Sequence, residues 1–167
     1  FSLAKEIQTL TKIIETPKKP LVLILGGAKI DTKIGVLKKF CKLADTIILG
    51  GGIANTFLAV QGLEVGKSLY EKDRIELAKE ILTEARAQNC EIILPSDVVC
   101  IQADEEISDK SKTYVLPIEE ISQNMKALDI GDRSSAQFLK IIQKAKMVVW
   151  NGPVGLFEFA PFAKGSE

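Results

Sequence analysis

The segment LVLILGGAKIDTKIGVL, residues 21–37, decides how this chain is expected to fold. Five aliphatic residues run into Gly26 and Gly27, and Lys29 and Lys33 follow. Beyond the second lysine, apolar residues recur at helical spacing. A continuous apolar run that ends in glycines and leads into an amphipathic helix is typical of a buried parallel strand and its crossover helix.

The same pattern of strand, glycine turn and helix recurs outward from this segment. The expected helices cover 2–16, 53–62, 71–89 and 133–145, and the expected strands cover 45–49, 91–95, 97–101 and 147–150. An exposed loop is expected over 102–113 and a further loop over 128–131. This alternation predicts a doubly wound α/β fold, with a mostly parallel sheet covered by helices on both faces in a Rossmann-like three-layer arrangement.

Composition is that of a soluble globular domain. The chain has 167 residues, of which 46% are hydrophobic, enough for a compact core. Lys plus Arg and Asp plus Glu both number 22, so no basic excess points to nucleic acid. No apolar run approaches the roughly 18 residues of a membrane span, and no secretory leader opens the chain. We expect a soluble, cytoplasmic protein with neither nucleic acid nor membrane as partner.

The ends of the chain suggest an excerpt. It starts at Phe1, and it stops at Glu167 just after a segment that opens a helix. We therefore expect residues 1–167 to be a truncated part of one domain of a longer protein.

Cysteine and histidine usage narrows the possible chemistry. Cys41, Cys90 and Cys100 are far apart and lie in aliphatic or helical sequence, so we expect reduced thiols in the core. The sequence contains no histidine, which removes the usual general base and the usual metal ligand. Any chemistry must use Lys, Asp, Glu, backbone amides or a metal ion.

Glycine turns close three of the predicted strands. Gly26 and Gly27 follow the first, the run 50–52 follows the second, and Gly152 with Pro153 follows the last. Ligands of open parallel sheets bind beyond the carboxyl ends of the strands, where the winding direction switches. Glycines there clear side chains from the site and expose the backbone. The sequence therefore predicts a binding crevice at this edge.

The two lysines favour an anion in that crevice. If Asp31 or Thr32 caps the following helix, Lys33 falls in its first turn, where the helix dipole disfavours a cation. Such a break of a local rule is expected at functional sites, and a phosphate beside Lys29 and Lys33 would compensate both charges. The alternative is that both side chains simply point into water.

Other polar residues near the predicted edge have two interpretations each. Glu158 is a candidate acceptor for ribose hydroxyls, or an ordinary solvated glutamate. Asn151 is a candidate phosphate ligand, or part of a structural Asn-Gly turn. Asp97 and Asp129 are interpreted as loop or capping residues, since neither has a carboxylate partner for a metal site. Trp150 is expected in the core beside the crevice.

Two phosphate-binding fingerprints are incomplete. Gly62, Gly66, Lys67 and Ser68 resemble a Walker A motif, but the first glycine is one residue too close and no strand precedes it. A helix C-cap followed by a loop is the better interpretation. In GGGIANTF, Asn55 stands where the third glycine of a dinucleotide fingerprint belongs.

Several longer strings resemble the phosphoglycerate kinase family, and of it the bacterial type. They are LGGAKIDTKIGVL (25–37), IILGGGIANTFL (47–58), VGKSLYE (65–71), LPSDVV (94–99), LDIGD (128–132), VVWNGPVGLFEF (148–159) and FAKG (162–165). The match is colinear along essentially the whole chain. It corresponds to most of the C-terminal, nucleotide-binding domain of a two-domain enzyme.

The resemblance implies phosphoryl transfer between 1,3-bisphosphoglycerate and ADP, giving 3-phosphoglycerate and Mg-ATP in glycolysis. Lys29 would meet the transferred group, and Lys33 the nucleotide phosphates; these two are the implied catalytic residues. The implied nucleotide-binding residues are Gly27, Lys29, Lys33, Gly51, Gly52, Leu128, Asn151, Gly152, Pro153, Val154 and Glu158. Among them, Gly51 and Gly52 would face Leu128 across adenine, and Glu158 would hold the ribose.

The chain departs from the family pattern at two positions and lacks a third feature. Thr32 stands where many members have an aspartate, and Ala127 where many have a glycine. The family's GGGD[ST] motif, with its magnesium aspartate, is expected beyond Glu167, so no metal ligand is assigned within the chain. Since the domain that binds 1,3-bisphosphoglycerate and 3-phosphoglycerate is also missing, we expect the excerpt alone to be inactive and its complete parent to be a monomer.

Two alternatives from other functional classes stay open. An NAD-dependent oxidoreductase domain would need a complete glycine fingerprint with an acidic residue about 20 positions on. A non-catalytic nucleotide-binding module would bind nucleotide without turnover even in the complete protein.

Overall fold

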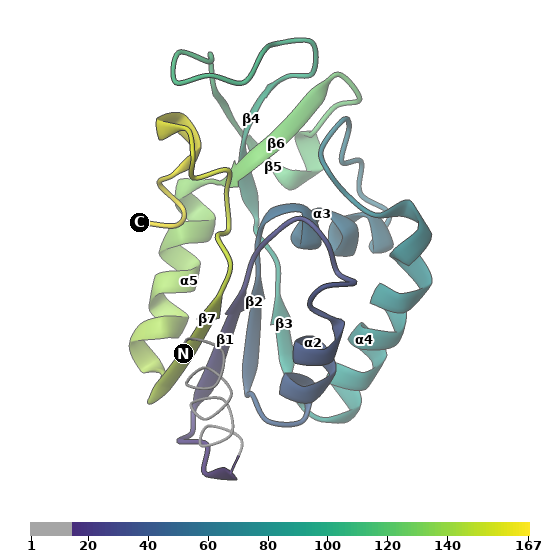
Figure 1. Cartoon of the computed structure of the whole chain (residues 1–167), viewed down its shortest axis with the longest axis vertical. Helices are drawn as coiled ribbons and strands as arrows, with labels where there is room; N and C mark the ends of the chain where they lie inside the picture. The colour runs from purple at the N-terminus through teal and green to yellow at the C-terminus, as the bar shows by residue number, and fades with distance from the viewer. Residues whose placement is uncertain (1–14) are drawn as a thin grey trace, which may run out of the picture.

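A computed structural model describes residues 15–167 (Figure 1). The expected helix over 2–16 lies almost wholly outside the described residues. The elements, in chain order, are β1 (Leu21–Leu25), α2 (Ile34–Cys41), β2 (Thr46–Leu49), α3 (Gly51–Val60), α4 (Ile75–Ala87), β3 (Glu91–Ile93), β4 (Asp97–Gln102), β5 (Tyr114–Pro117), β6 (Met125–Ile130), α5 (Asp132–Lys144) and β7 (Met147–Asn151).

A four-stranded parallel sheet forms the base of the molecule. Its strand order is β3-β2-β1-β7, so the quoted strand β1 lies between β2 and β7. Leu23 is paired with Ile47 on one side and with Val149 on the other. All five residues of β1 are buried, as its uninterrupted aliphatic sequence predicts for a strand covered on both faces.

Helices cover both faces of this sheet, which confirms the predicted α/β class. Figure 1 shows α2, α3 and α4 on one side of the sheet and α5 on the other. Successive side chains of a strand point to opposite faces. Leu21, Leu23 and Leu25 therefore join the core beneath α2, α3 and α4, whereas Val22 and Ile24 pack in a second cluster with residues of α5.

The second half of the chain adds a separate antiparallel sheet, which the sequence pattern did not predict. Its strand order is β5-β4-β6, and it lies above the carboxyl edge of the parallel sheet in Figure 1. The expected loop over 128–131 was wrong, because residues 125–130 form strand β6. A short aliphatic run reads alike in a parallel and an antiparallel strand. Only the pairing partner, remote in sequence, distinguishes the two.

Asp97 ties the antiparallel sheet to α5. It is the first residue of β4, and its carboxylate accepts the N–H of Arg133 at 3.1 Å and of Ser134 at 2.7 Å. These are donors of the first turn of α5, which the helix itself leaves unsatisfied. Of the two interpretations made for Asp97, a loop or a capping residue, these contacts support capping, although Asp97 lies in a strand and the helix that it caps is far along the chain.

Two further expectations have opposite outcomes. Cys41, Cys90 and Cys100 are free and buried, as predicted. Trp150 was expected in the core and is instead 50% exposed, because β7 is the outer strand of the parallel sheet in the described chain. Its indole N–H donates to the carbonyl of Gly152 at 2.8 Å, which explains its position beside the turn.

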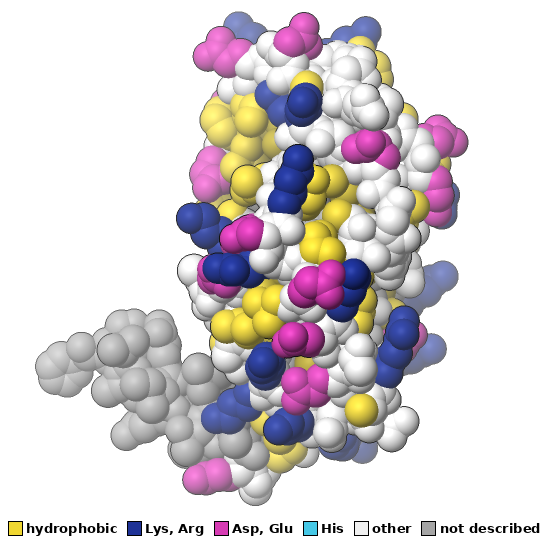
Figure 2. Space-filling model, turned by 90° about the vertical axis from the view of Figure 1, so that its right-hand side faces the viewer, with side chains coloured by type: hydrophobic (Ala, Val, Ile, Leu, Met, Phe, Trp, Pro, Cys, Tyr) yellow, Lys and Arg dark blue, Asp and Glu magenta, His cyan; other side chains and the backbone are white. Residues whose placement is uncertain are grey.

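The surface shows no segregation of charge on the face viewed in Figure 2. Lysine and arginine side chains are interspersed there with aspartate and glutamate. Within residues 15–167, we find no helix whose length and apolar character would allow it to cross a membrane.

Candidate functional site

The structure brings the three glycine turns together at the carboxyl edge of the parallel sheet. The N–H of Gly26 donates to Asn151 O at 3.0 Å, and that of Gly50 to Leu25 O at 3.0 Å. The N–H of Gly51 reaches Val154 O at 2.9 Å. The turns after β1, β2 and β7 therefore form one continuous backbone surface.

Close packing between the turns, more than room for a ligand, is what requires most of these glycines. A Cβ on Gly26 would lie 1.9 Å from Pro153 O, and one on Gly152 would lie 2.6 Å from Gly26 O. Gly51 has a φ of 62° and would place a Cβ 2.9 Å from Gly27 O. Gly27 differs, since its φ is 118° and its added Cβ would meet no atom within 4 Å. Among the glycines that follow β1, β2 and β7, only Gly27 has open space facing its backbone.

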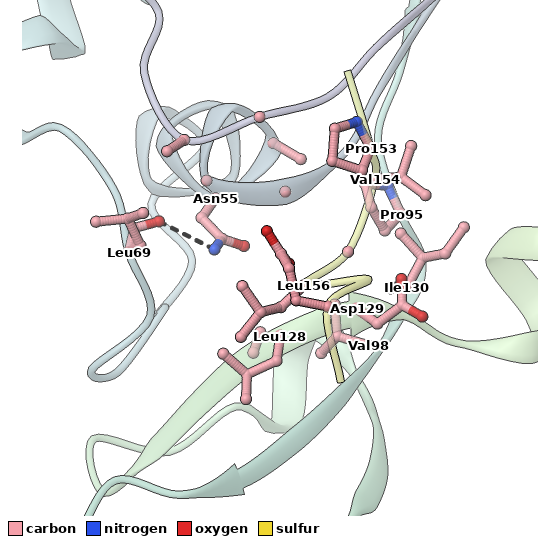
Figure 3. Close-up of a pocket in the computed structure, with 18 residues that line it drawn as sticks. Asn55, Leu69, Pro95, Val98, Leu128, Asp129, Ile130, Pro153, Val154 and Leu156 are labelled. Atoms are coloured by element: carbon pink, nitrogen blue, oxygen red, sulfur yellow. Dashed lines mark hydrogen bonds between the residues drawn. The ribbon is translucent and has the colours of Figure 1, made fainter. Parts of the chain in front are cut away.

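A cavity of about 230 Å³ opens beside these turns, between the parallel sheet and the antiparallel one. It is lined by Gly27, Ala28, Gly51, Gly52, Ala54, Asn55, Leu69, Pro95, Val98, Ala127, Leu128, Asp129, Ile130, Pro153, Val154, Gly155, Leu156 and Glu158. Figure 3 shows Asn55 of α3 across the cavity from Leu128 and Leu156. Drug-sized pockets span roughly 300–1,000 Å³, so this cavity suits one apolar, ring-sized part of a ligand.

Seven of the sequence-predicted residues line this cavity, and four do not. The seven are Gly27, Gly51, Gly52, Leu128, Pro153, Val154 and Glu158, and the four are Lys29, Lys33, Asn151 and Gly152. Three of those four continue the wall in sequence, because Lys29 follows Ala28, and Asn151 and Gly152 precede Pro153. Lys33 is joined to them through its hydrogen bond to Asn151. The interior of the cavity is largely apolar, with Asn55, Asp129 and Glu158 as polar side chains of its lining, and Lys29 and Lys33 lie on the loop that leaves it.

Lys33 was expected in the first turn of the helix. It is instead the residue that precedes α2. Its ammonium group donates to the side-chain oxygen of Asn151 and so joins the turns after β1 and β7. Neither Asp31 nor Thr32 caps the helix, because α2 has no side-chain cap at its start. Thr32 instead donates its hydroxyl to Lys29 O at 3.0 Å. Lys29 itself is exposed.

Asp129 is a buried carboxylate in the cavity wall. It is 4% exposed, and burial raises its pKa to about 6 although the N–H groups of Ile130 and Gly165 donate to it. An added Cβ on Gly155 would lie 2.1 Å from its Oδ1. Asp129 therefore holds the segment after β7 against β6, which shapes the cavity floor. The capping interpretation made from the sequence placed this residue in a loop and missed that role.

Several residues of the cavity wall were not proposed as site residues from the sequence. Leu69 belongs to the stretch between α3 and α4, and its carbonyl accepts the side-chain N–H of Asn55 at 3.1 Å (Figure 3). Asn55 is 6% exposed, and sequence reasoning considered it only as a defective third glycine. An amide side chain one turn into a helix that starts with glycines was the signal available for Asn55. Leu156 and Pro95 come from segments remote from α3 in sequence and could not be placed by pattern.

Comparison with known proteins decides the family. A family model described as phosphoglycerate kinase matches residues 1–167. The chain belongs to the phosphoglycerate kinase family. The structure of phosphoglycerate kinase from Coxiella burnetii is 39% identical in sequence, with a TM-score of 0.90 over 98% of this chain. Phosphoglycerate kinase from Pyrococcus horikoshii OT3 is 27% identical, with a TM-score of 0.80 over 97%.

The chain spans 41% of the length of both of these phosphoglycerate kinases. Its similarity to them therefore concerns one part of a longer enzyme. Membership of the phosphoglycerate kinase family also argues against the alternative that this chain is an NAD-dependent oxidoreductase domain. The place of the missing third glycine is filled by Asn55, whose amide joins α3 to the stretch that carries Leu69.

Proposed function

We propose that this chain is the nucleotide-binding part of a glycolytic kinase that transfers a phosphoryl group between 1,3-bisphosphoglycerate and ADP. The supporting observation is the apolar cavity at the carboxyl edge of the parallel sheet, where open-sheet proteins bind their ligands. Its size suits an adenine ring. Leu128 and Leu156 would contact one side of the ring, and the backbone of Gly51 and Gly52 the other.

The ribose and phosphates would follow the wall out of the cavity. Glu158 lies at the rim, exposed, where its carboxylate could accept hydrogen bonds from ribose hydroxyls. Lys33 lies on the loop beyond, and Asn151 is the last residue of β7, so an incoming phosphate would take over the lysine ammonium from the asparagine oxygen. The open face of Gly27 leaves room for the phosphate chain to touch backbone.

Lys29 would act on the transferred group. Phosphoryl transfer depends on positioning and on the spreading of charge over cations and metal, with little covalent chemistry for the protein. An ammonium group on an exposed loop, which forms no ion pair within residues 15–167, suits that role. The acceptor or donor carboxylate would be presented by a part of the enzyme outside this chain.

Magnesium would accompany the nucleotide. Within residues 15–167, no group of three or more acidic, cysteine or histidine side chains is arranged to hold a metal ion. The ion would therefore be held here through the phosphates, with the protein ligand expected from the GGGD[ST] motif. Since that motif and the phosphoglycerate-binding domain would be needed for turnover, the 167-residue chain alone is proposed to bind nucleotide without catalysing transfer.

Trp150 offers a direct test of binding. Its indole N–H donates to Gly152 O, so its fluorescence should respond when a ligand shifts the turn after β7. We expect a saturable change on titration with Mg-ADP, weakened at least tenfold by Lys33→Ala. Lys38→Ala removes the same charge from an exposed position of α2 and should leave the titration unchanged. Equal curves for both variants, or no response in the folded chain, would contradict the proposal.

Turnover separates a kinase from a non-catalytic module. The complete protein should form ATP from ADP and 1,3-bisphosphoglycerate, and Lys29→Ala should lower kcat by at least 100-fold. Tight binding of Mg-ADP without ATP formation by the complete protein would instead support the non-catalytic alternative.

A further inference from the structure

Two side chains from the stretch before α4 hold the loop that carries Lys29. Glu71 Oε2 accepts the N–H of Ile30 at 2.5 Å. Arg74 Nη2 donates to Asp31 Oδ2 at 2.7 Å, and its Nε lies 2.6 Å from Asp31 Oδ1. These contacts are made one and two residues after Lys29, so they fix the backbone next to it.

The other end of this connection is the buried start of α3. The N–H of Glu71 donates to Thr56 Oγ1 at 3.1 Å, and the Thr56 hydroxyl donates to Gly52 O at 3.0 Å. Thr56 is fully buried, and Gly52 lines the cavity. Glu71 therefore joins the Lys29 loop to the helix whose first turn forms the cavity wall. Neither Glu71 nor Arg74 lines the cavity.

The loop needs such a restraint. It begins with Gly26 and Gly27, and the second of these has a left-handed φ of 118° with no neighbour within 4 Å of an added Cβ. Lys29 is exposed, and none of the ion pairs found within residues 15–167 includes it. A loop rich in glycine and carrying like charges would otherwise sample many conformations.

The two contacts differ in strength. The Asp31–Arg74 pair is partly exposed, with 49% and 36% of the side chains accessible, and exposed pairs contribute little. Its contribution here is electrostatic. Arg74 lowers the pKa of Asp31, and its positive charge balances the negative charge of a carboxylate that would otherwise repel phosphate. The Glu71 contact satisfies the N–H of Ile30, which is fully buried, and a buried donor without a partner is costly.

We propose that Glu71 and Arg74 are positioning residues that hold Lys29 where the transferred phosphoryl group will lie. This inference rests on the proposed function of Lys29. Glu71 supplies the main restraint through the backbone of Ile30, and Arg74 supplies a second one while neutralising Asp31. A displacement of about 1 Å at a catalytic group can cost about 100-fold in rate, so a restraint without ligand contact can still govern kcat.

The test uses the complete protein and separates kcat from nucleotide affinity. Glu71→Ala should lower kcat at least tenfold while the Kd for adenosine, which needs only the cavity, changes less than twofold. Glu71→Gln keeps an acceptor oxygen at the same reach and should restore kcat to within about threefold. A tenfold loss in both variants would exclude the backbone contact as the cause.

The matched control is Glu64→Ala. Glu64 lies in the same connection between α3 and α4, and its carboxylate also accepts a backbone N–H, that of Gly66 at 2.7 Å. It has no contact with the Lys29 loop in the described structure. Its removal should leave kcat unchanged. A loss equal to that of Glu71→Ala would show a general effect of loosening this connection and would overturn the proposal.

Combined variants show whether Glu71 acts through Lys29. In a Lys29→Ala background, Glu71→Ala should cause no further loss of kcat, whereas independent effects would multiply. If Lys29→Ala alone leaves kcat unchanged, the proposed function of Lys29 fails. If it lowers kcat but Glu71→Ala does not, only the positioning role fails. Should Glu71→Ala not fold, Glu71→Asp, which shortens the reach to the N–H of Ile30, decides in its place, with a loss of kcat expected and full activity overturning the proposal. Asp31→Asn and Arg74→Gln, singly and together, test the second restraint, with equal non-additive losses expected and full activity excluding Arg74 as a positioning residue.

Discussion

The carboxylate of Asp129 accepts the N–H of Gly165 at 2.9 Å from a position that is only 4% exposed. Strand β6 thereby holds the last described segment of the chain. Because burial raises the pKa of Asp129 from 3.8 to about 6, the folded state binds a proton there more tightly than the unfolded state does. The corresponding stabilisation is present below about pH 4 and is lost as pH rises through 6.

We therefore expect the free energy of unfolding to fall between pH 4 and pH 7, by up to about 3 kcal/mol from this group. Asp129→Asn should flatten the dependence, since the amide stays neutral. The measurement is urea unfolding at several pH values. Asp132→Asn, at a side chain that is 75% exposed, is the control and should keep the wild-type slope. A slope unchanged in Asp129→Asn would show that the carboxylate stays ionised throughout.

Two glycines with opposite surroundings test the packing of the turns. Gly26→Ala would place its Cβ 1.9 Å from Pro153 O, so we expect a loss of about 3 kcal/mol or more in unfolding free energy. Gly35 lies in the first turn of α2 with no atom within 4 Å of an added Cβ. Gly35→Ala should stabilise the chain by up to about 1 kcal/mol. Thermal unfolding of both variants checks this, and equal effects would contradict the packing of β1 against the turn after β7.

Ser134 is the polar link between α5 and β4. It is fully buried, and its hydroxyl accepts the N–H of Ser96 at 2.9 Å and of Asp97 at 3.0 Å. Ser134→Ala should destabilise the chain by about 1–3 kcal/mol, because two buried donors lose their acceptor. Ser135→Ala removes only a hydroxyl contact to Gly131 O and should cost less than about 1 kcal/mol. Denaturant unfolding of the two neighbours gives the comparison directly.

Leu128 forms part of the apolar cavity wall without full burial. Leu128→Ala should weaken Mg-ADP binding roughly tenfold, which corresponds to the loss of about 1.4 kcal/mol of contact with the base. Calorimetric titration measures it. Leu139→Ala, at a position that is 53% exposed and outside the cavity, should leave the affinity unchanged. Unaltered binding by the first variant would place the base elsewhere.

The three cysteines should be unreactive in the native chain. Burial raises the pKa of Cys41 to about 11 and those of Cys90 and Cys100 to about 12, so thiolate is scarce at pH 8. An aromatic disulfide reagent should label none of them before denaturation and all three afterwards. Rapid labelling of a single thiol under native conditions would reveal local opening around it.

Local sequence pattern predicted the strands and helices of the parallel layer, whose burial on one or two faces is reflected in the spacing of their apolar residues. The run 21–25 is apolar at every position because β1 has a core on each face, and helices α2 to α5 follow the expected periodicity. The glycines after three strands indicated a common edge, since carboxyl ends of parallel strands must meet there. Seven of the eleven residues proposed for nucleotide do line the cavity.

What pattern could not predict depends on partners distant in the chain. The antiparallel pairing of strand β6 and the place of Asp129 in the cavity wall each follow from a neighbour more than 20 residues away. The exposure of Trp150 follows from the outer position of β7 in the parallel sheet of the described chain. The hydrogen bond from the N–H of Ile30 to Glu71 joins residues that are 41 positions apart in sequence. Spacing within one segment carries no information on such contacts.

By itself, the sequence determined which segments are strands or helices of the parallel layer and where their glycines fall, because backbone sterics and burial on one or two faces act within a few residues. Tertiary structure alone decided that those glycines serve chiefly to let three turns touch, and that the Lys29 loop is fastened to α3 through Glu71. The physical reason is that close packing and buried hydrogen bonds are satisfied between segments, and each segment is compatible with many partners until the chain is folded.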